Sequence, residues 1–140
     1  QLQITNSTIE VCKFLSKHFL LFLITNQPDI PRLVNSRVNV ENINNFLKKK
    51  LILSDVVTNY SDDENNFFRK PNPGMILYLS KKYNINLKKS YLVGDRWRDI
   101  DAGNKVGCST IFIDKNYNEK LNTKSKFIVK KFQQILKFVK

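Results

Sequence analysis

Several features that would assign this chain of 140 residues to a special class of protein are scarce. The longest unbroken apolar run, Phe19 to Ile24, is far shorter than the roughly 20 residues that cross a bilayer, so no membrane-spanning segment is expected. The two cysteines, Cys12 and Cys108, lie near opposite ends of the chain and form neither a disulfide framework nor spaced metal ligands. We therefore expect a reducing, cytoplasmic setting.

The chain also lacks internal repeats, low-complexity tracts, a secretory signal pattern and any linker rich in Pro, Gly or Ser. It has four glycines and four prolines, with 41% hydrophobic and 26% charged residues, which is typical of a globular domain. These observations predict one domain over residues 1–140.

Acidic residues are few, at 12 against 24 Lys and Arg, and the net charge of +12 invites a nucleic-acid interpretation. Lys, Asn, Ile and Phe together make up 59 of the 140 residues, however, and their codons consist mostly of A and T. The lysines are scattered, and Arg, the better phosphate ligand, numbers only five. We therefore do not expect a nucleic-acid partner, although a polyanion-binding module remains an alternative.

Hydrophobic periodicity predicts an alternation of helices and strands. A short helix over residues 7–17 is expected to begin at Asn6 or Ser7, with Glu10 as the capping partner, and residues 19–24 form a strand buried on both faces. Residues 59–73 are a polar loop. Further helices are expected over 40–50, 74–83, 99–106 and 124–140, and further strands over 51–57, 90–93 and 110–113. This order predicts an α/β fold with a mainly parallel sheet covered by helices.

Polar residues follow three of these strands, and ligands collect at the carboxyl ends of parallel strands. The three segments are Thr25-Asn26-Gln27, the loop with Arg69-Lys70, and Gly94-Asp95-Arg96. A hydroxyl, a lysine and a carboxylate on one rim could serve phosphoryl transfer with a divalent cation. Taken singly, each signal is weak, because a Thr at a strand end is usually a helix cap, a Lys before Pro is normally a solvated loop charge, and Gly-Asp after a strand is often only a turn.

The amino-acid sequences of these segments, and their order along the chain, are more specific than the single residues. Leu23-Ile-Thr-Asn-Gln-Pro28, Arg69-Lys-Pro-Asn-Pro-Gly-Met75 and Tyr91-Leu-Val-Gly-Asp-Arg-Trp-Arg-Asp-Ile-Asp-Ala-Gly103 resemble motifs II, III and IV of the haloacid-dehalogenase-like phosphohydrolases. They resemble in particular the branch with histidinol phosphatase and heptose-1,7-bisphosphate phosphatases. The resemblance covers residues 4 to 115 and implies a Rossmann-like three-layer α/β/α fold.

The resemblance also implies roles for the phosphate-binding residues. Thr25 would bind the phosphoryl group through its hydroxyl, and the backbone of Asn26, Gln27 and Pro28 would complete the cradle. Lys70 would stabilise the charge on the transferring group.

Three further residues receive roles from the same resemblance. Arg69 would select the sugar phosphate, Arg96 would add a phosphate contact, and Asp95 would ligate Mg²⁺. Asp99 would orient Lys70 or cap the following helix, and Ala102-Gly103 would let that helix pack closely against the sheet.

The sequence departs from the family pattern in two places. The nucleophilic Asp-x-Asp pair expected before Ser7 is missing, and Asp99-Ile-Asp101 lies in the motif IV match instead. Because that pair lies on a central strand of the fold, and because Gln1 is not Met, we expect a fragment of a longer protein that lacks its nucleophile strand. The positions of the four zinc ligands found in related heptose phosphatases hold non-ligands, so zinc is not expected: Asn59, Ser61, Asn66 and Phe68.

The expected function is a cytoplasmic, Mg²⁺-dependent phosphatase of a small sugar phosphate. The resemblance favours a heptose-1,7-bisphosphate 7-phosphatase of bacterial surface-polysaccharide (lipopolysaccharide) biosynthesis, acting as a monomer, with the 140-residue chain itself inactive. Histidinol-phosphate phosphatase activity and a catalytically dead phosphate- or polyanion-binding module are the alternatives.

Overall fold

The computed structural model describes residues 4–27 and 34–139, and its chain divides into two compact units, residues 1–62 and 63–140. Among the described residues, no helix is both long and apolar enough to cross a membrane.

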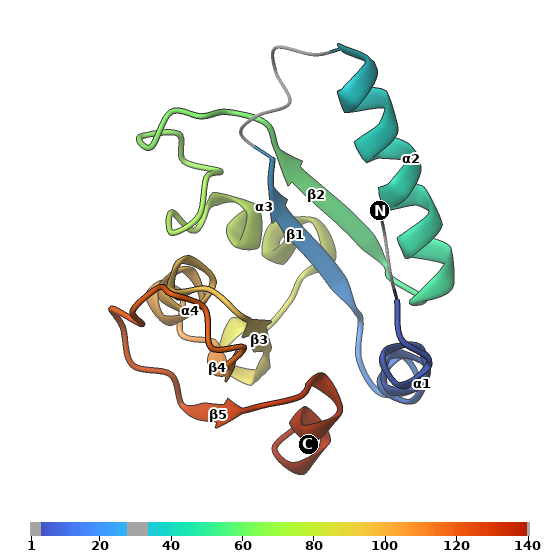
Figure 1. The fold of residues 1–140 in the computed structure, drawn as a ribbon, viewed down its shortest axis with the longest axis vertical. Coiled ribbons are helices and arrows are strands. Elements are labelled where there is room, and N and C mark those ends of the chain that lie inside the picture. Colours follow the sequence, from blue (N-terminus) through green and yellow to red (C-terminus); the bar gives the residue numbers. More distant parts are fainter. Residues whose placement is uncertain (1–3, 28–33, 140) are drawn as a thin grey trace. The chain divides into compact units, whose positions relative to one another are not determined.

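The first unit contains two parallel strands and two helices (Figure 1). Strand β1 (Phe22–Asn26) pairs along its whole length with β2 (Asp55–Asn59). Helix α1 (Asn6–Leu15) precedes β1, and helix α2 (Val34–Lys50) connects the two strands and contacts β2. This is the parallel crossover that the alternating pattern predicts.

The start of α1 differs from the expectation. The Thr5 hydroxyl, rather than Asn6 or Ser7, accepts the backbone N–H of Thr8 at 3.2 Å. Thr5 has an extended backbone while the residues after it are helical, which is the geometry of an N-cap. Asn6 and Ser7 therefore lie inside the first turn.

Both strands of the first unit begin later than their apolar runs. Phe19 donates its backbone N–H to Leu15 at 2.8 Å, so it still belongs to the exit of α1, and β1 is half-buried along its length rather than fully buried. Leu51 likewise donates to Leu47 at 2.8 Å and completes the end of α2. Local i→i−4 hydrogen bonds at the helix ends thus use residues whose side chains favour strands.

The second unit is a three-stranded parallel sheet in the order β3-β4-β5. Helix α3 (Gly74–Tyr83) has the predicted bounds, and a short 3₁₀ helix, η1 (Leu87–Lys89), leads into β3 (Tyr91–Gly94). Helix α4 (Trp97–Lys105) packs against β3 and β4 (Ser109–Ile113). The sheets and helices confirm the α/β class.

Helix α4 packs closely against strands β3 and β4. Ile100 and Ala102 are 0% exposed. A Cβ atom added to Gly103 would lie 2.9 Å from Thr110 Cγ2 and 3.0 Å from Leu92 Cβ. The expected role of Ala102-Gly103 in close packing is confirmed.

The predicted closing helix over residues 124–140 is wrong. Residues Phe127–Val129 form strand β5, parallel to β4, and only Phe132–Lys137 is helical, as the 3₁₀ helix η2. Three consecutive bulky β-formers fit the pleated edge of the sheet, and the Phe127 ring stacks on Phe138 with centroids 4.2 Å apart. Pairing with β4 therefore outweighs the helical spacing of the apolar residues.

We expect the Ile100→Ala variant to lower the free energy of unfolding by about 2–5 kcal/mol, because it leaves a cavity beneath α4. The matched control is Ile128→Ala on β5, where the side chain is 59% exposed, and it should cost less than about 1 kcal/mol. Urea unfolding measures both changes. Equal costs for the two variants would contradict the position of the core.

Candidate functional site

The turn between β3 and α4 carries the motif IV residues. Asp95 and Arg96 follow the last residue of β3, and Asp99 lies in the first turn of α4. Asp99 Oδ2 accepts the backbone N–H of Arg96 at 3.2 Å, so this carboxylate caps the helix. A Cβ atom on Gly94 would lie 2.3 Å from Asp99 Cβ, so the turn needs glycine at this position.

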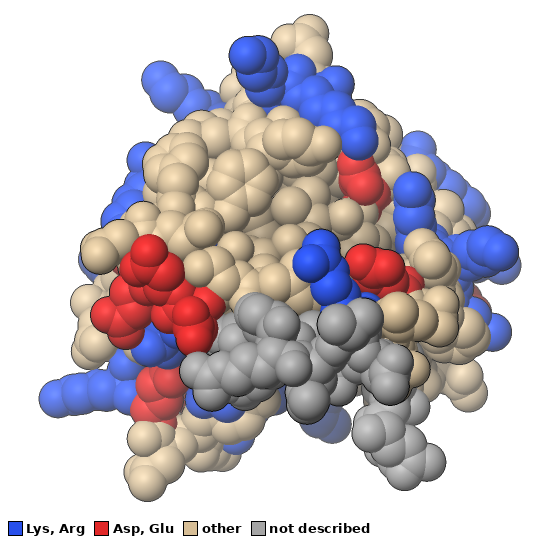
Figure 2. All heavy atoms as spheres, turned by 90° about the horizontal axis from the view of Figure 1, so that it is seen from above, with Lys and Arg blue, Asp and Glu red and all other residues tan. Residues whose placement is uncertain are grey.

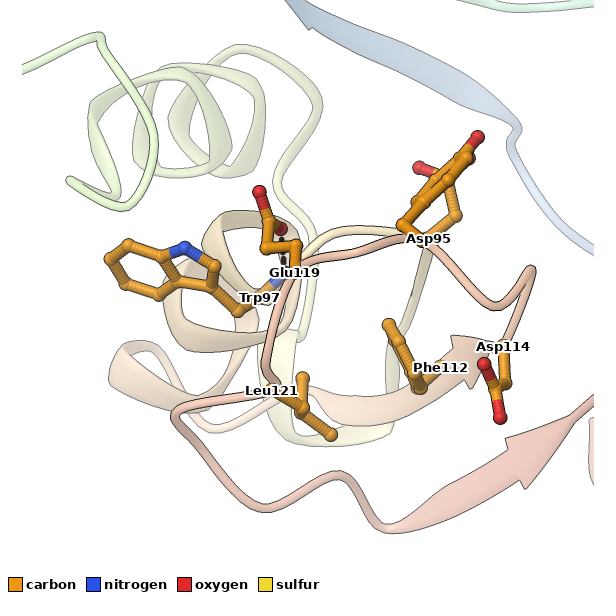
Figure 3. A pocket seen from close by; sticks show the side chains of 7 residues that line it. Asp95, Trp97, Phe112, Asp114, Glu119 and Leu121 are labelled. Atoms are coloured by element: carbon orange, nitrogen blue, oxygen red, sulfur yellow. Dashed lines mark hydrogen bonds between the residues drawn. The ribbon is translucent and has the colours of Figure 1, made fainter.

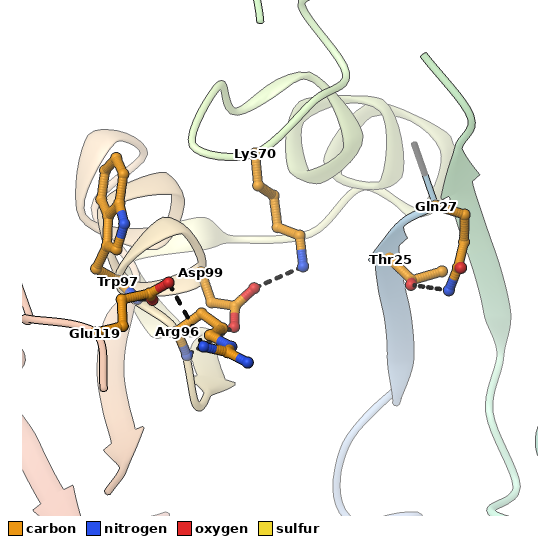
Figure 4. Close-up of polar contacts among 7 residues, drawn as sticks. All are labelled: Thr25, Gln27, Lys70, Arg96, Trp97, Asp99 and Glu119. Atoms are coloured by element: carbon orange, nitrogen blue, oxygen red, sulfur yellow. Dashed lines mark hydrogen bonds and ion pairs between the residues drawn. The ribbon is translucent and has the colours of Figure 1, made fainter. Parts of the chain in front are cut away.

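The second oxygen of the same carboxylate binds Lys70. Lys70 Nζ lies 2.6 Å from Asp99 Oδ1, and the two side chains are only 12% and 15% exposed (Figure 4). Asp99 therefore both orients Lys70 and caps α4, the two roles that the sequence left open. The pair therefore fixes the position of Lys70 Nζ at the start of the helix.

The loop that carries Arg69 and Lys70 is held by hydrogen bonds to its own backbone carbonyl groups. Asn72 Nδ2 donates to the carbonyl of Asn66 at 2.9 Å, and the N–H of Gly74 donates to the carbonyl of Phe67 at 2.9 Å. Arg69 N–H also donates to Asn66 at 3.0 Å. The loop can therefore present Lys70 without help from a metal ion or a disulfide.

The four positions at which the sequence has no zinc ligands take part in turns. Asn59 Oδ1 accepts the N–H of Ser61 at 3.4 Å in the first unit, and Asn66 Oδ1 accepts the N–H of Phe68 at 2.9 Å in the second. These are Asx turns, in which a side-chain amide closes the backbone locally.

The motif II residues lie in the first unit. Thr25 is next to last in β1, and Gln27 Nε2 donates to its hydroxyl oxygen at 3.1 Å (Figure 4). The backbone N–H of Gln27 donates to the carbonyl oxygen of Asn59 at 2.8 Å. Asn26 is the partner of Asn59 in the register of β1 and β2. Pro28 lies outside the described residues. Thr25, Asn26 and Gln27 therefore gather at the carboxyl end of their strand, as predicted.

A pocket of about 210 Å³ opens beside Asp95 in the second unit (Figure 3). Residues that follow β3 and β4 line it: Asp95, Trp97, Phe112, Asp114, Tyr117, Glu119 and Leu121. The segment after β4 carries none of the three motifs. The rule that parallel strands end at one rim could have found it, because Asp114 directly follows β4 as Asp95 follows β3.

Asp95 is already engaged by this segment. Its Oδ2 accepts the hydroxyl of Tyr117 at 3.0 Å and lies 3.5 Å from Lys115 Nζ. Arg96 places its guanidinium carbon 3.7 Å from the centre of the Tyr117 ring. Tyr117 thus contacts both residues of the predicted cation and phosphate site.

The neighbouring acid Asp114 is held by Lys130. The hydrogen bond from Lys130 Nζ, at 2.8 Å, lowers the pKa of Asp114, and the N–H of Asn116 lowers it further. The carboxylate therefore stays charged, and the start of the segment is tied to the end of β5.

Asp95 suits Mg²⁺ as one oxygen ligand, because hard cations prefer carboxylates. In residues 4–27 and 34–139 no three His, Cys, Asp or Glu side chains gather as a metal-binding group. Asp99 is committed to Lys70, and Asp114 to Lys130. The described residues therefore fit a contribution to a magnesium site but do not form a complete one.

Neither cysteine has the properties of a nucleophile. Burial raises the pKa of Cys108 to about 11 and also raises the pKa of Cys12. Since the thiolate is the reactive form, both thiols are inert near neutral pH.

The sequence comparisons agree with this geometry. The family model described as HAD-hydrolase-like matches residues 67–135, which contain Lys70, Asp95 and α4. The chain belongs to the haloacid-dehalogenase-like superfamily. The matched residues contain motifs III and IV, and the expected family resemblance is confirmed.

Curated relatives of this haloacid-dehalogenase-like chain are heptose-bisphosphate phosphatases. The D-glycero-alpha-D-manno-heptose-1,7-bisphosphate 7-phosphatase of Campylobacter jejuni is 27% identical over 109 residues, covering 74% of this chain and 63% of the relative. The beta-heptose enzyme of Helicobacter pylori J99 is 32% identical over 93 residues, covering 61% and 53%. The chain thus matches less than two thirds of the length of these relatives.

Solved haloacid-dehalogenase-like structures share the fold. The D,D-heptose 1,7-bisphosphate phosphatase of B. bronchiseptica, complexed with magnesium and phosphate, superimposes with a TM-score of 0.74 at 17% identity, covering 95% of this chain and 83% of that one. A HAD phosphatase of Thermococcus onnurineus gives 0.67 at 20% identity, covering 96% and 57%. The Rossmann-like α/β fold expected from the motifs is therefore confirmed.

We expect Asp99→Asn to lower the free energy of unfolding by about 1–3 kcal/mol, because Lys70 loses a charged partner in a site with little water. Asp101→Asn on the same helix is the control: its pair with Lys105 is 28% and 43% exposed, and the change should stay within about 0.5 kcal/mol. Thermal unfolding compares the two, and equal stabilities would contradict a buried pair.

We expect iodoacetamide to alkylate Cys108 at pH 8 about 100-fold more slowly than a peptide thiol with a pKa near 8.5. The rate should rise as the pH approaches 11, because the thiolate forms only there. Peptide mapping by mass spectrometry measures the rate, with the urea-unfolded chain as control. Rapid alkylation of the folded chain would refute the raised pKa.

Proposed function

We propose that this protein acts as a Mg²⁺-dependent phosphatase of a small sugar bisphosphate, with heptose 1,7-bisphosphate as substrate and the 7-phosphate as the group removed. The relatives in Campylobacter jejuni and Helicobacter pylori carry this activity in their names and support the substrate class. The observation that carries the proposal is the Lys70–Asp99 pair at the start of α4. It supplies a fixed positive charge where a phosphoryl group would develop negative charge.

The proposed roles of the other residues follow from their positions. Thr25 would donate its hydroxyl to a phosphoryl oxygen, and the backbone around Asn26, Gln27 and Pro28 would complete the cradle at the end of β1. Gln27 keeps the Thr25 hydroxyl oriented by donating to its oxygen, which leaves the hydroxyl proton for a ligand.

The charged residues of the second unit would bind the rest of the substrate and the cation. Arg69 and Arg96 would contact phosphate oxygens, and Asp95 would provide one oxygen ligand for Mg²⁺. When bound, the ion would neutralise negative charge on the transferring phosphoryl group. Lys70 performs the same electrostatic task from a position fixed by Asp99.

The nucleophile is proposed to come from outside these 140 residues. The sequence has one Asp-x-Asp string, Asp99-Ile-Asp101, and both of its carboxylates are engaged. Asp99 binds Lys70 and the N–H of Arg96, and Asp101 lies 3.1 Å from Lys105 Nζ. Asp99 cannot attack phosphate without disrupting the start of α4. Asp101 lies one turn inside the helix and not in the turn after β3, so we do not expect the chain by itself to form an aspartyl-phosphate.

The alternative of a polyanion-binding module has less support. On the face drawn in Figure 2 the basic side chains lie in several separate groups with uncharged residues between them. Several of the lysines are paired with acids within 4 Å: Lys70, Lys105, Lys115 and Lys130. We propose a cytoplasmic monomer that acts in heptose and surface-polysaccharide synthesis.

Phosphate release tests the proposed function. A version of the protein with an Asp-x-Asp strand joined ahead of α1 should release phosphate from heptose 1,7-bisphosphate with Mg²⁺, and the 140-residue chain should release none. Lys70→Met should lower kcat by about 100-fold or more, because it removes a preorganised charge. The control is Lys81→Met, the same change at an exposed position of α3, and it should leave kcat unchanged.

The outcomes separate the alternatives. Phosphate release from histidinol phosphate alone would identify histidinol phosphate as the substrate in place of the heptose bisphosphate. Phosphate release from no phosphomonoester would overturn the proposal. Turnover by the 140-residue chain would show that the nucleophile lies within these 140 residues. Tight binding to duplex DNA that weakens steeply with salt would favour the polyanion module.

A further inference from the structure

The segment Lys115–Glu119, called the strap below, follows β4 and Asp114, and its residues Tyr117 and Glu119 line the pocket of the second unit. Its first end follows Asp114, which is bound by Lys130 at 2.8 Å, and Asn116 turns back with a φ of 58° to donate its N–H to Asp114. Its other end, Glu119, accepts the backbone N–H of Trp97 at 3.4 Å (Figure 3). The strap is thus fixed at both ends.

The middle of the strap supplies positive charge to Asp95. Lys115 Nζ lies 3.5 Å from Asp95 Oδ2, and the Tyr117 hydroxyl donates to the same oxygen at 3.0 Å. An ammonium and a hydroxyl donor on one carboxylate oxygen provide what a bound cation would provide. Asp95 therefore has its charge compensated by the chain itself.

The end of the strap supplies negative charge to the arginines. Glu119 Oε2 lies 3.5 Å from Arg96 Nη1 (Figure 4). The same oxygen lies 3.7 Å from Arg98 Nη1. The other oxygen of Glu119 takes the N–H of Trp97, the first residue of α4. A carboxylate that receives two guanidinium groups and a helix N–H occupies the contacts that a phosphate group would use.

We propose that the strap is an internal occupant of the site, in which Lys115 stands in for the cation at Asp95 and Glu119 for the anion at Arg96 and Arg98. Binding of a divalent cation or of a phosphate must displace the corresponding side chain. Tyr117 couples the two halves, because its hydroxyl binds Asp95 and its ring lies against Arg96. This inference rests on the proposed function for the identity of the two ligands.

The strap is weak enough to be displaced. Lys115 is 51% exposed and Asp95 31%, while Arg96 is 46% and Glu119 27% exposed. Ion pairs at this exposure are modest and are screened by salt. Removing one of them should therefore change a binding constant by about two- to fivefold.

The binding of simple ions to the 140-residue chain tests the strap. Trp97 is the only tryptophan in the sequence and lies in the pocket wall, so its fluorescence reports on this site alone. We expect Lys115→Gln to bind Mg²⁺ about two- to fivefold more tightly than the unchanged chain, with phosphate binding little altered. Glu119→Gln should bind inorganic phosphate more tightly by a similar factor, since glutamine keeps the acceptor for Trp97 but loses the charge.

Two further variants serve as controls. Lys120→Gln removes the same charge from an exposed neighbour of the strap and should leave both dissociation constants unchanged. Tyr117→Phe keeps the ring against Arg96 but loses the hydroxyl bond to Asp95, and it should tighten Mg²⁺ binding only. Circular dichroism checks that each variant is folded.

Each outcome decides the proposal. Equal affinities in Lys115→Gln and the unchanged chain, or equal changes in Lys115→Gln and Lys120→Gln, would overturn it. An absence of both Mg²⁺ and phosphate binding in every variant would also overturn the proposal. If the shifts occur while the form with an Asp-x-Asp strand releases no phosphate, the strap stands and the proposed function fails.

Discussion

The contact between Asp99 and Lys70 organises the second unit. One carboxylate closes the first turn of α4 with one oxygen and fixes an ammonium with the other. The loop before α3 and the turn after β3 are thereby held to one another although 29 residues separate them in sequence. Because both charges are shielded from water, each is costly to leave alone, and the pair forms only when the loop and the turn are both in place.

The engaged state of Asp95 and Arg96 explains how a strongly charged rim remains stable without ligands. Carboxylates and guanidinium groups that lie close together need partners, and the chain provides them from the segment after β4. The same groups that make the rim suitable for a cation and a phosphate thus also stabilise it in their absence. The neutral thiols of Cys12 and Cys108 add no competing nucleophile.

Much of this could be predicted from sequence, and the exceptions have physical causes. The strand-helix alternation and the exact bounds of α3 follow from local patterns. The family resemblance offered two alternative roles for Asp99, and the structure shows that it has both. The closing segment was assigned to a helix because parallel pairing of Phe127–Val129 with β4 is a long-range contact that periodicity does not reveal. The strap was missed because its residues match no motif, and their importance arises only when β3 and β4 end at the same rim.

The close approach of Gly94 to Asp99 has a consequence for how such proteins can diverge. Any side chain at position 94 would collide with the carboxylate-bearing residue, 2.3 Å away from the added carbon, and would push it off Lys70. The glycine is therefore needed for as long as the aspartate binds the lysine. Lineages that keep the charged pair must keep the glycine, and a lineage that loses the glycine should show the lysine and the aspartate replaced together.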